Sequence, residues 1–352
     1  MDSNFELLTL TLLPGVGART VRDLAARGPL GDVLGRPEEH FDLLSKAAVS
    51  HLRSGEARRR AEGELARAAS LGLGIVALSD PDYPPLLRQI YDPPAVLYVR
   101  GRLSPDEGKM SVTIVGSRAA SPRGSALARE MSRDLAAAGA TIVSGLARGI
   151  DSAAHRGALD ARGRTVAVLG SGLDRIYPGE NEPLAAQIAE QGAVVSEFPL
   201  GTAPVPGNFP RRNRVLAGWG RVVLVVEAAR RSGALVTARV ALDEGRDVLA
   251  VPGHPRDAAS AGTNQLIVDG APLVRDAADV AAHLGFEIGE ADKAAIVGDD
   301  DVFRALEPGN PASLSELQER CRRPVSDLLV RLTELELADR VRRLPGPLFM
   351  RP

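Results

Sequence analysis

Glycine-rich turns that also carry arginine follow two apolar segments in the middle of the chain, residues 112–115 and 141–144. The two turns contain Gly116, Ser117, Arg118, Gly145, Arg148 and Gly149. Glycine lets the backbone come close to a ligand, and the arginine guanidinium matches the planar geometry of a phosphate. A buried strand that ends in such a turn before a helix presents unpaired backbone N–H groups. The pattern therefore predicts an anion site, with phosphate as the anion.

A second cationic segment is expected to be a loop at residues 206–214. Its aromatic, amide and cationic side chains are Phe209, Arg211, Arg212, Asn213 and Arg214. An aromatic ring among arginines can stack on a nucleobase while the guanidinium groups hold the phosphates, which is how proteins bind single-stranded nucleic acid. Phe209 could instead fill the core beneath the loop, and the residues alone leave both interpretations open.

The sequence lacks the motifs of enzymes that act on small phosphates. It contains no P-loop motif, and Gly170-Ser171-Gly172 lacks the third glycine of the dinucleotide fingerprint. Asp151 and His155 are one helical turn apart and could form a metal pair. We favour a structural role, in which Asp151 caps a helix and His155 bonds a neighbouring carbonyl. We therefore expect no catalytic set, no metal and no cofactor.

The glycine turns require a scaffold that brings them to one edge. Strands are expected at residues 112–115, 141–144, 165–169, 193–196, 222–226 and 247–251, with helices between them. Most of these strands are continuous apolar runs, which indicates burial on both faces. The pattern predicts an α/β domain over residues 112–285, built on a doubly wound, mostly parallel sheet. The ligand site of such a sheet lies beyond the carboxyl ends of its strands, where the glycine turns follow.

Smaller modules are expected on both sides of this core. Residues 1–65 predict a helical domain with a Pro-Gly-x-Gly turn that contains Gly15 and Gly17 and precedes Arg19. The turn resembles a helix–hairpin–helix motif, whose N–H groups bind nucleic-acid phosphate, but an ordinary hairpin of two helices uses the same glycines. Residues 301–352 predict three helices and a β-hairpin, which is the winged-helix pattern.

The remaining segments are expected to connect these modules. Residues 66–111 contain several prolines that exclude a long helix, and they are expected to form an extended connector packed on the core. Residues 286–300 are charged and lack apolar periodicity, as is typical of a linker.

The composition places limits on compartment and partners. The net charge of the 352 residues is −2, so any site for a polyanion must be a local patch. The two end modules are close to charge balance, and for residues 301–352 protein docking is at least as good an interpretation as DNA binding. The single cysteine excludes an internal disulfide, and we expect no signal peptide and no membrane span. These features favour a cytoplasmic protein.

Several motifs in order along residues 80–275 resemble the DprA/Smf family of DNA processing proteins (DNA processing protein A). They are Gly116-Ser117-Arg118, the run from Ser144 to Asp151 with Ala154-His155, Gly170-Ser171-Gly172-Leu173-Asp174 with Tyr177-Pro178, Ser196-Glu197, the run from Phe209 to Arg214, Val226-Glu227-Ala228, the run from Ser232 to Ala238, and Gly245-Arg246 leading to Pro252-Gly253. The resemblance implies a Rossmann-like core with an N-terminal SAM-like or helix–hairpin–helix domain and a C-terminal winged-helix-like domain.

The same resemblance implies a function. Such proteins bind incoming single-stranded DNA in natural transformation and recombination, load the RecA recombinase onto it, form homodimers through the core and have no known catalytic step. A single-strand-binding protein is left open as a further partner. By matching motif, Ser117, Arg118 and the loop from Phe209 to Arg214 would line the DNA pocket, and Gly145 and Gly149 would allow close backbone approach. If the N-terminal turn is a helix–hairpin–helix motif, Gly15, Gly17 and Arg19 would form a secondary DNA contact.

One departure from the family pattern and two alternative functions stay open. Where the family continues with Ile-Ile-Ser-Gly-Leu-Ser after Asn213-Arg214, this chain has residues 215–220, in which Trp219 could stack or pack. A nucleotide hydrolase of the LOG type would need a glutamate that the run from Ser232 to Ala238 lacks. A duplex-DNA regulator acting through the end modules ranks lower, because both modules are near charge balance.

Overall fold

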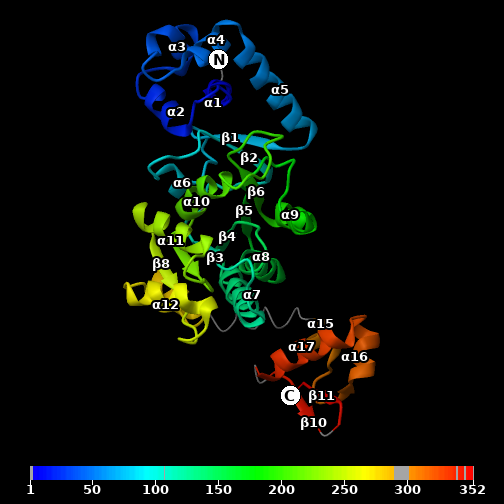
Figure 1. Ribbon diagram of the computed structural model, residues 1–352. Helices are drawn as coiled ribbons and strands as arrows, with labels where there is room; N and C mark the ends of the chain where they lie inside the picture. The colour runs from blue at the N-terminus through cyan, green and yellow to red at the C-terminus, as the bar shows by residue number, and fades with distance from the viewer. Residues whose placement is uncertain (1–2, 107, 289–300, 338–339, 345, 352) are drawn as a thin grey trace. The chain divides into compact units, whose positions relative to one another are not determined.

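The computed structural model describes residues 3–106, 108–288, 301–337, 340–344 and 346–351 (Figure 1). The chain forms two compact units, Met1–Glu287 and Ile288–Pro352. Residues 289–300 of the expected linker lie outside the described residues. No helix in the described ranges is long and apolar enough to cross a membrane.

A parallel sheet forms the centre of the first unit. Its strands are β3 (Ser111–Val115), β4 (Thr141–Ser144), β5 (Thr165–Val168), β6 (Ala193–Ser196), β7 (Val222–Val225) and β8 (Asp247–Ala250). Every residue of the five strands β3, β4, β5, β6 and β7 is buried, as expected for strands covered by helices on both faces. The strand order is β6-β5-β4-β3-β7-β8. Along the chain, β4, β5 and β6 follow one another on one side of β3, and the chain then returns to place β7 and β8 on the other side, so the order reverses between β3 and β7. The predicted doubly wound α/β fold is confirmed, and the reversal is the point at which such sheets bind ligands.

The segment expected to be an extended connector contributes two strands to this sheet. β1 (Gly74–Ala77) pairs antiparallel with β2 (Val96–Gly101), which pairs antiparallel with β6. Tyr98 of β2 lies opposite Ser196 in this register. Within the described residues the sheet therefore has eight strands, with the two antiparallel ones at the edge farthest from β8.

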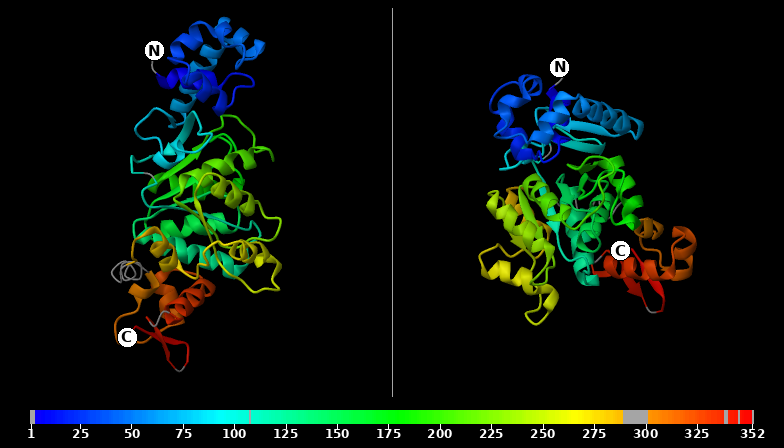
Figure 2. Two further views of the ribbon diagram at one scale, coloured as in Figure 1. Left: turned by 90° about the vertical axis from the view of Figure 1, so that its left-hand side faces the viewer. Right: turned by 45° about the horizontal axis from the view of Figure 1, so that its top comes forward.

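Two groups of helices flank the sheet (Figures 1 and 2). In one group α7 (Pro122–Ala137) packs on α8 (Ile150–Asp160), with α9 (Glu182–Gln191) against α8 and α13 (Ala277–Leu284) against α7. In the other, α10 (Asn208–Trp219) packs between α11 (Gly233–Asp243) and α6 (Pro85–Arg88), and α12 (Ala261–Val268) packs on β8. Short 3-10 helices are η1 (Pro37–His40), η2 (Gly179–Asn181) and η3 (Ala258–Ser260).

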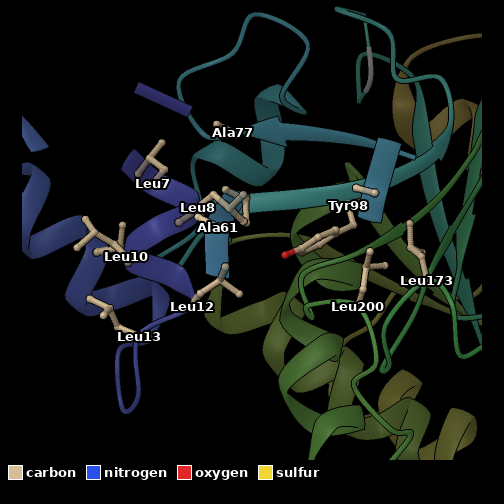
Figure 3. Close-up of a cluster of buried hydrophobic side chains, with 14 of the residues drawn as sticks. Leu7, Leu8, Leu10, Leu12, Leu13, Ala61, Ala77, Tyr98, Leu173 and Leu200 are labelled. Atoms are coloured by element: carbon tan, nitrogen blue, oxygen red, sulfur yellow. The ribbon is translucent and has the colours of Figure 1, made fainter. Parts of the chain in front are cut away.

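The N-terminal helices share a hydrophobic core with the sheet. They are α1 (Ser3–Thr11), α2 (Ala18–Ala25), α3 (Leu30–Gly35), α4 (Lys46–Arg53) and α5 (Glu56–Ser70). Figure 3 shows leucines of α1 next to residues of the sheet and its loops, in one buried cluster that includes Leu7, Leu8, Leu10, Ala61, Ala77, Tyr98, Leu173 and Leu200. This shared core explains why residues 1–65 and the α/β core form one compact unit.

The second unit has the predicted winged-helix arrangement. Its elements are α15 (Asp301–Ala305), β9 (Ala312–Ser313), α16 (Leu314–Cys321), α17 (Val325–Leu337), β10 (Arg342–Leu344) and β11 (Leu348–Met350). Ser313 caps α16, and Glu316 bonds back to the Ser313 N–H in a capping box. Phe303, Leu317 and Leu332 belong to a separate buried cluster. This unit therefore has its own core.

The shared core of the first unit predicts the effect of truncating Leu8. Leu8→Ala removes a fully buried side chain and should lower the free energy of unfolding by about 2–5 kcal/mol. The N-terminal helices and the sheet should still unfold in one denaturant transition, measured by circular dichroism. Leu71→Ala, at a side chain that is 50% exposed, is the matched control and should change stability by less than about 0.5 kcal/mol. Separate transitions in the Leu8 variant would contradict the shared core.

Candidate nucleic-acid interface

A cleft of about 660 Å³ opens at the reversal point between β3 and β7. The turn after β3 and the first turns of α10 and α11 supply most of its wall. Among the residues that line it are Gly116, Ser117, Arg118, Asp151, Tyr177, Phe209, Arg212, Asn213, Ser232 and Gly233. Ligand pockets in proteins typically have volumes of about 300–1,000 Å³, so the cleft can hold a ligand of nucleotide size.

The turn after β3 is held in place by Glu227. The Ser117 N–H donates to the Glu227 carbonyl oxygen at 2.7 Å. The Glu227 carboxylate, almost fully buried, accepts hydrogen bonds from the Ser121 N–H at 3.0 Å and the Ser121 hydroxyl at 2.5 Å. Ser121 in turn caps α7. The Ser117 N–H is thus engaged within the protein and is not available to a ligand.

The glycines of the two turns are required by contacts within the protein. Gly149 has a φ of +72°, and a Cβ on it would lie 2.9 Å from the Arg118 carbonyl oxygen. A Cβ on Gly145 would lie 2.7 Å from Asp151 Oδ2 and would also overlap the Arg212 guanidinium. A Cβ on Gly116 would lie 2.8 Å from Ile150 Cβ. At Gly145 and Gly149 the space that a side chain would need is therefore occupied by other parts of the protein, where the sequence suggested close approach of a ligand.

The expected loop at residues 206–214 is in fact the start of a helix. α10 begins at Asn208, and Pro210 fits in its first turn because the first N–H groups of a helix have no intrahelical acceptor. Successive side chains on a helix point in directions about 100° apart, so neighbouring residues face different surroundings. Phe209, Arg212 and Asn213 line the main cleft, whereas Asn208 and Arg211 line a second one.

Arg118 is exposed and rests on an aromatic ring. Its guanidinium carbon lies 5.3 Å from the centre of the Phe209 ring, within the range of a cation–π contact. The Phe209 ring is half-buried, and a Cβ on Gly170 would lie 2.9 Å from its Cδ1 atom. The Tyr177 ring lies 5.8 Å from it at an angle of 50°. Phe209 thus packs on the turn below and also lines the cleft.

Arg212 is buried beneath the cleft and ties α10 to the sheet. Its Nη1 donates to the Gly145 carbonyl oxygen at 2.9 Å and to that of Val168, the last residue of β5. Asp151 lies near the same face of Gly145 and accepts from the Gly145 and Ala147 N–H groups. Burial lowers the pKa of Arg212 to about 10 and raises the pKa of Asp151 above its usual range. Arg212 is therefore a structural cation, where the sequence suggested a phosphate ligand.

Two more of the predicted arginines are engaged by carboxylates. Arg214, whose side chain is 16% exposed, bonds Glu197 Oε2 at 2.5 Å and lies 3.4 Å from Asp92 Oδ2. Burial raises the pKa of Glu197 above its usual range. Arg148 is exposed, but both sides of its guanidinium fork bond Glu180, at 2.8 and 2.7 Å. Arg118 and Arg211 make no ion pair with any residue that the structure describes.

Arg211 lies in a second cleft, of about 290 Å³, with residues of the N-terminal turn. Its guanidinium carbon is 5.1 Å from the centre of the Phe198 ring. Gly17, which precedes α2, lines the same cleft, and Gly15 is exposed in the turn with a φ of +74°. Arg19 lies outside both clefts, with its guanidinium 5.1 Å from the Tyr91 ring centre. The first turn of α10 thus separates Arg118 from Arg211.

Tyr177 and the N-terminus of α11 also line the main cleft, whereas Trp219 lies outside it. Tyr177, on the loop after β5, is 46% exposed at the cleft, although the sequence indicates it only as part of a family motif. The N-terminus of α11 lines the cleft at Ser232 and Gly233, and the Ser232 hydroxyl accepts from the Ala234 N–H at 3.2 Å. Trp219 is fully buried beside the core residues Leu87 and Ile90, so it packs and does not stack on a ligand.

The pair of Asp151 and His155 has a structural role, with partners that differ from those expected. Asp151 accepts from N–H groups that precede α8, and the helix has no side-chain cap. His155 Nδ1 bonds the Thr165 hydroxyl at 2.7 Å, where a carbonyl partner was expected. Burial lowers the pKa of His155 to about 3. In the described part of the chain no three metal-ligating side chains gather in one place.

The contrast between Arg118 and Arg212 predicts losses of stability of very different size. Arg212→Ala leaves two strand-end carbonyls and Asp151 buried without their cation and should lower the free energy of unfolding by about 3–5 kcal/mol. Arg118→Ala, the matched arginine truncation, should cost less than about 1 kcal/mol because the side chain is exposed. Urea unfolding of both variants measures the difference. Equal losses would show that the two arginines were assigned wrongly.

The two compact units of the chain match two different protein-family models. Residues 74–285 match the model of the DNA recombination-mediator protein A family, and residues 298–347 match the DprA winged helix domain. Protein Smf of Synechocystis sp. is 48% identical over 209 residues, which are 58% of this chain and 52% of that protein. The match therefore spans about half the length of that relative.

Two solved structures have the same fold. The X-ray structure of DNA processing protein A (DprA) from Streptococcus pneumoniae is 35% identical, has a TM-score of 0.70, and is matched over 81% of this chain and 99% of its own. DNA processing protein A from Helicobacter pylori, described for its single-stranded DNA binding mode, is 29% identical with a TM-score of 0.55, over 60% of this chain and 95% of its own. The family model spans more than half of the chain. The chain belongs to the DNA recombination-mediator protein A family, DprA/Smf.

Proposed function

We propose that this protein binds single-stranded DNA in the main cleft. The observation that carries the proposal is the exposed Arg118 guanidinium, which has no carboxylate partner among the described residues and is held on an aromatic ring at a cleft of nucleotide size. A helix N-terminus on the same cleft, at Ser232 and Gly233, adds the partial positive charge that favours phosphate. The relative from H. pylori was described as a single-stranded DNA binder, which supports the same ligand class.

The form of the cleft favours a single strand over a duplex. Stacking on an aromatic side chain requires an unpaired base, because the faces of paired bases are covered by their neighbours in the helix. The negative net charge of the chain gives no general attraction for duplex phosphates. Binding should therefore depend on a local set of phosphate contacts and weaken with increasing salt.

The second cleft is a continuation of the binding path. It lies on the other side of the first turn of α10 and presents Arg211 next to the Gly17 turn of the N-terminal helices. A strand that fills the main cleft and crosses this turn reaches Arg211. Under this proposal Gly17 and Arg211 contact the DNA only when the strand is long enough to span both clefts.

Arginine truncations test the binding proposal. Arg118→Ala should weaken binding of single-stranded oligonucleotides about tenfold to a hundredfold, the value of a charged hydrogen bond. Arg211→Ala should weaken binding only of the longer oligonucleotides. Fluorescence anisotropy at fixed salt measures both. Arg275→Ala, at an exposed arginine paired with Asp279 outside the two clefts, is the control and should bind as the parent does. Unchanged affinity in Arg118→Ala would refute the site.

We further propose that the bound strand is handed to RecA in natural transformation and recombination, in the cytoplasm, without a catalytic step of the protein's own. Membership of the recombination-mediator family supports this role. The ionisable residues of the main cleft also support it: Asp151 is buried against Arg212, and the α11 start lacks the glutamate of LOG-type hydrolases. A single-strand-binding protein is then a partner through the DNA that it covers.

The RecA proposal predicts a gain of function that needs the cleft. On single-stranded DNA already covered by single-strand-binding protein, the full chain should speed RecA filament assembly, and Arg118→Ala should not. The rate of DNA-dependent ATP hydrolysis by RecA measures assembly. On bare DNA the chain should have little effect, which is the control. Equal acceleration by the parent and Arg118→Ala would separate RecA loading from this site.

We propose a second copy of the chain as a partner at the β8 edge of the core. β8 is the last strand on its side of the sheet, and apolar side chains are exposed on the helices next to it. They are Val236 and Leu242 of α11, Val268 at the end of α12, and Leu273 beyond it. A symmetric contact between two copies of this surface would cover these side chains. The proposal agrees with the homodimer that the family resemblance implies.

A further inference from the structure

We propose that Tyr177 is the surface on which a nucleobase of the bound strand stacks, and that Phe209 positions the Arg118 guanidinium. The proposal rests on the proposed function, because it assigns the base contact within the same cleft. It differs from the sequence interpretation, in which Phe209 was the candidate for stacking.

The surroundings of Phe209 leave it little free surface. The Arg118 guanidinium and the Tyr177 ring lie against its ring, and the ring comes so close to Gly170 that a Cβ there would lie 2.9 Å from its Cδ1 atom. A base that stacked on Phe209 would have to displace either the cation that binds the phosphate or a neighbouring aromatic ring. The ring is better placed to fix the direction of Arg118, since a guanidinium packs flat against an aromatic face.

Tyr177 has the exposure that Phe209 lacks. Its side chain is 46% exposed, it lines the main cleft, and its one aromatic neighbour among the described residues is Phe209, in a tilted contact. Tyrosine offers a large flat surface and has few rotatable bonds, so it loses little conformational entropy on binding. A base on this ring and a phosphate on Arg118 would lie on two sides of Phe209.

The loop that carries Tyr177 is anchored on both sides of it. The Ser171 hydroxyl donates to the Arg175 carbonyl oxygen at 2.7 Å. Asn181, which is buried, donates through Nδ2 to the Leu146 carbonyl oxygen at 2.8 Å and to the Ser152 hydroxyl at 2.9 Å. The loop is therefore ordered before the strand arrives, which reduces the entropic cost of stacking.

The ligand class follows from these contacts. An aromatic ring stacks on any base, and no exposed carboxylate or amide is placed beside Tyr177 in the main cleft to select one base over another. The exposed carboxylate of Glu180, three residues further along the same loop, is paired with Arg148. We infer that the position takes one base of a single strand without regard to sequence.

Titration of tyrosine variants with two kinds of strand tests the proposal. Tyr177→Ala should weaken binding of an ordinary single-stranded oligonucleotide on the order of tenfold, and it should not change binding of an abasic oligonucleotide of the same length. Tyr177→Phe should bind as the parent does, since the ring and not the hydroxyl is used. Tyr91→Ala is the matched control, because Tyr91 is 61% exposed and lies outside both clefts.

A direct spectroscopic readout comes from Tyr177→Trp, with the parent as the blank because its one tryptophan, Trp219, is buried. Ordinary strands should quench the new fluorescence, and abasic strands should not.

If Tyr177→Ala binds as the parent does while Arg118→Ala does not, the stacking assignment is wrong and the proposed function stands. If the parent binds no single strand, both are wrong. If Tyr177→Ala weakens both kinds of strand equally, Tyr177 supports the fold of the cleft and stacks on no base.

Discussion

The hydrogen bonds of one buried guanidinium hold the interface together. Arg212 leaves α10 and bonds the carbonyl oxygens of Gly145 and Val168, at the carboxyl ends of two neighbouring strands. Because the cation is nearly fully buried, losing it would leave two buried strand-end carbonyls without a donor. The bonds fix the rotation of α10 about its axis. That rotation places Phe209 over Gly170 in the main cleft and Arg211 in the second cleft.

The positive charge of the site is consequently divided between two tasks. Arg212 and Arg214 are buried and hold α10 against the sheet and against Glu197, and Arg148 is bonded to Glu180. Arg118 and Arg211 are the two of the five that remain available, and each rests on an aromatic ring, Phe209 or Phe198. An exposed cation held on a ring keeps its charge facing solvent with less freedom to lose on binding. This arrangement gives a chain of net charge −2 a local surface for phosphate.

The six parallel strands could be predicted to within one residue at each end, because apolar runs buried on both faces have few alternatives; β4 and β6 begin and end where the pattern placed them. The separate roles of Arg211, Arg212 and Arg214 could not. Their segment is rich in proline and glycine and predicts a loop, whereas Pro210 in fact sits in the first turn of a helix. Adjacent residues on a helix face different sides, so one arginine is exposed and the next is buried. Likewise, the sequence shows the glycines of the turns but not that their space is filled by Arg212 and the Ser117 turn.

A structure of the full chain bound to a short single-stranded oligonucleotide tests most directly which arginines bind phosphate and which hold the fold. We predict a phosphate oxygen within hydrogen-bond distance of the Arg118 guanidinium, with Arg212 still bonded to the carbonyl oxygens of Gly145 and Val168. A phosphate bound by Arg212 or Arg214 after they have left these partners would contradict it. So would a strand that lies outside both clefts.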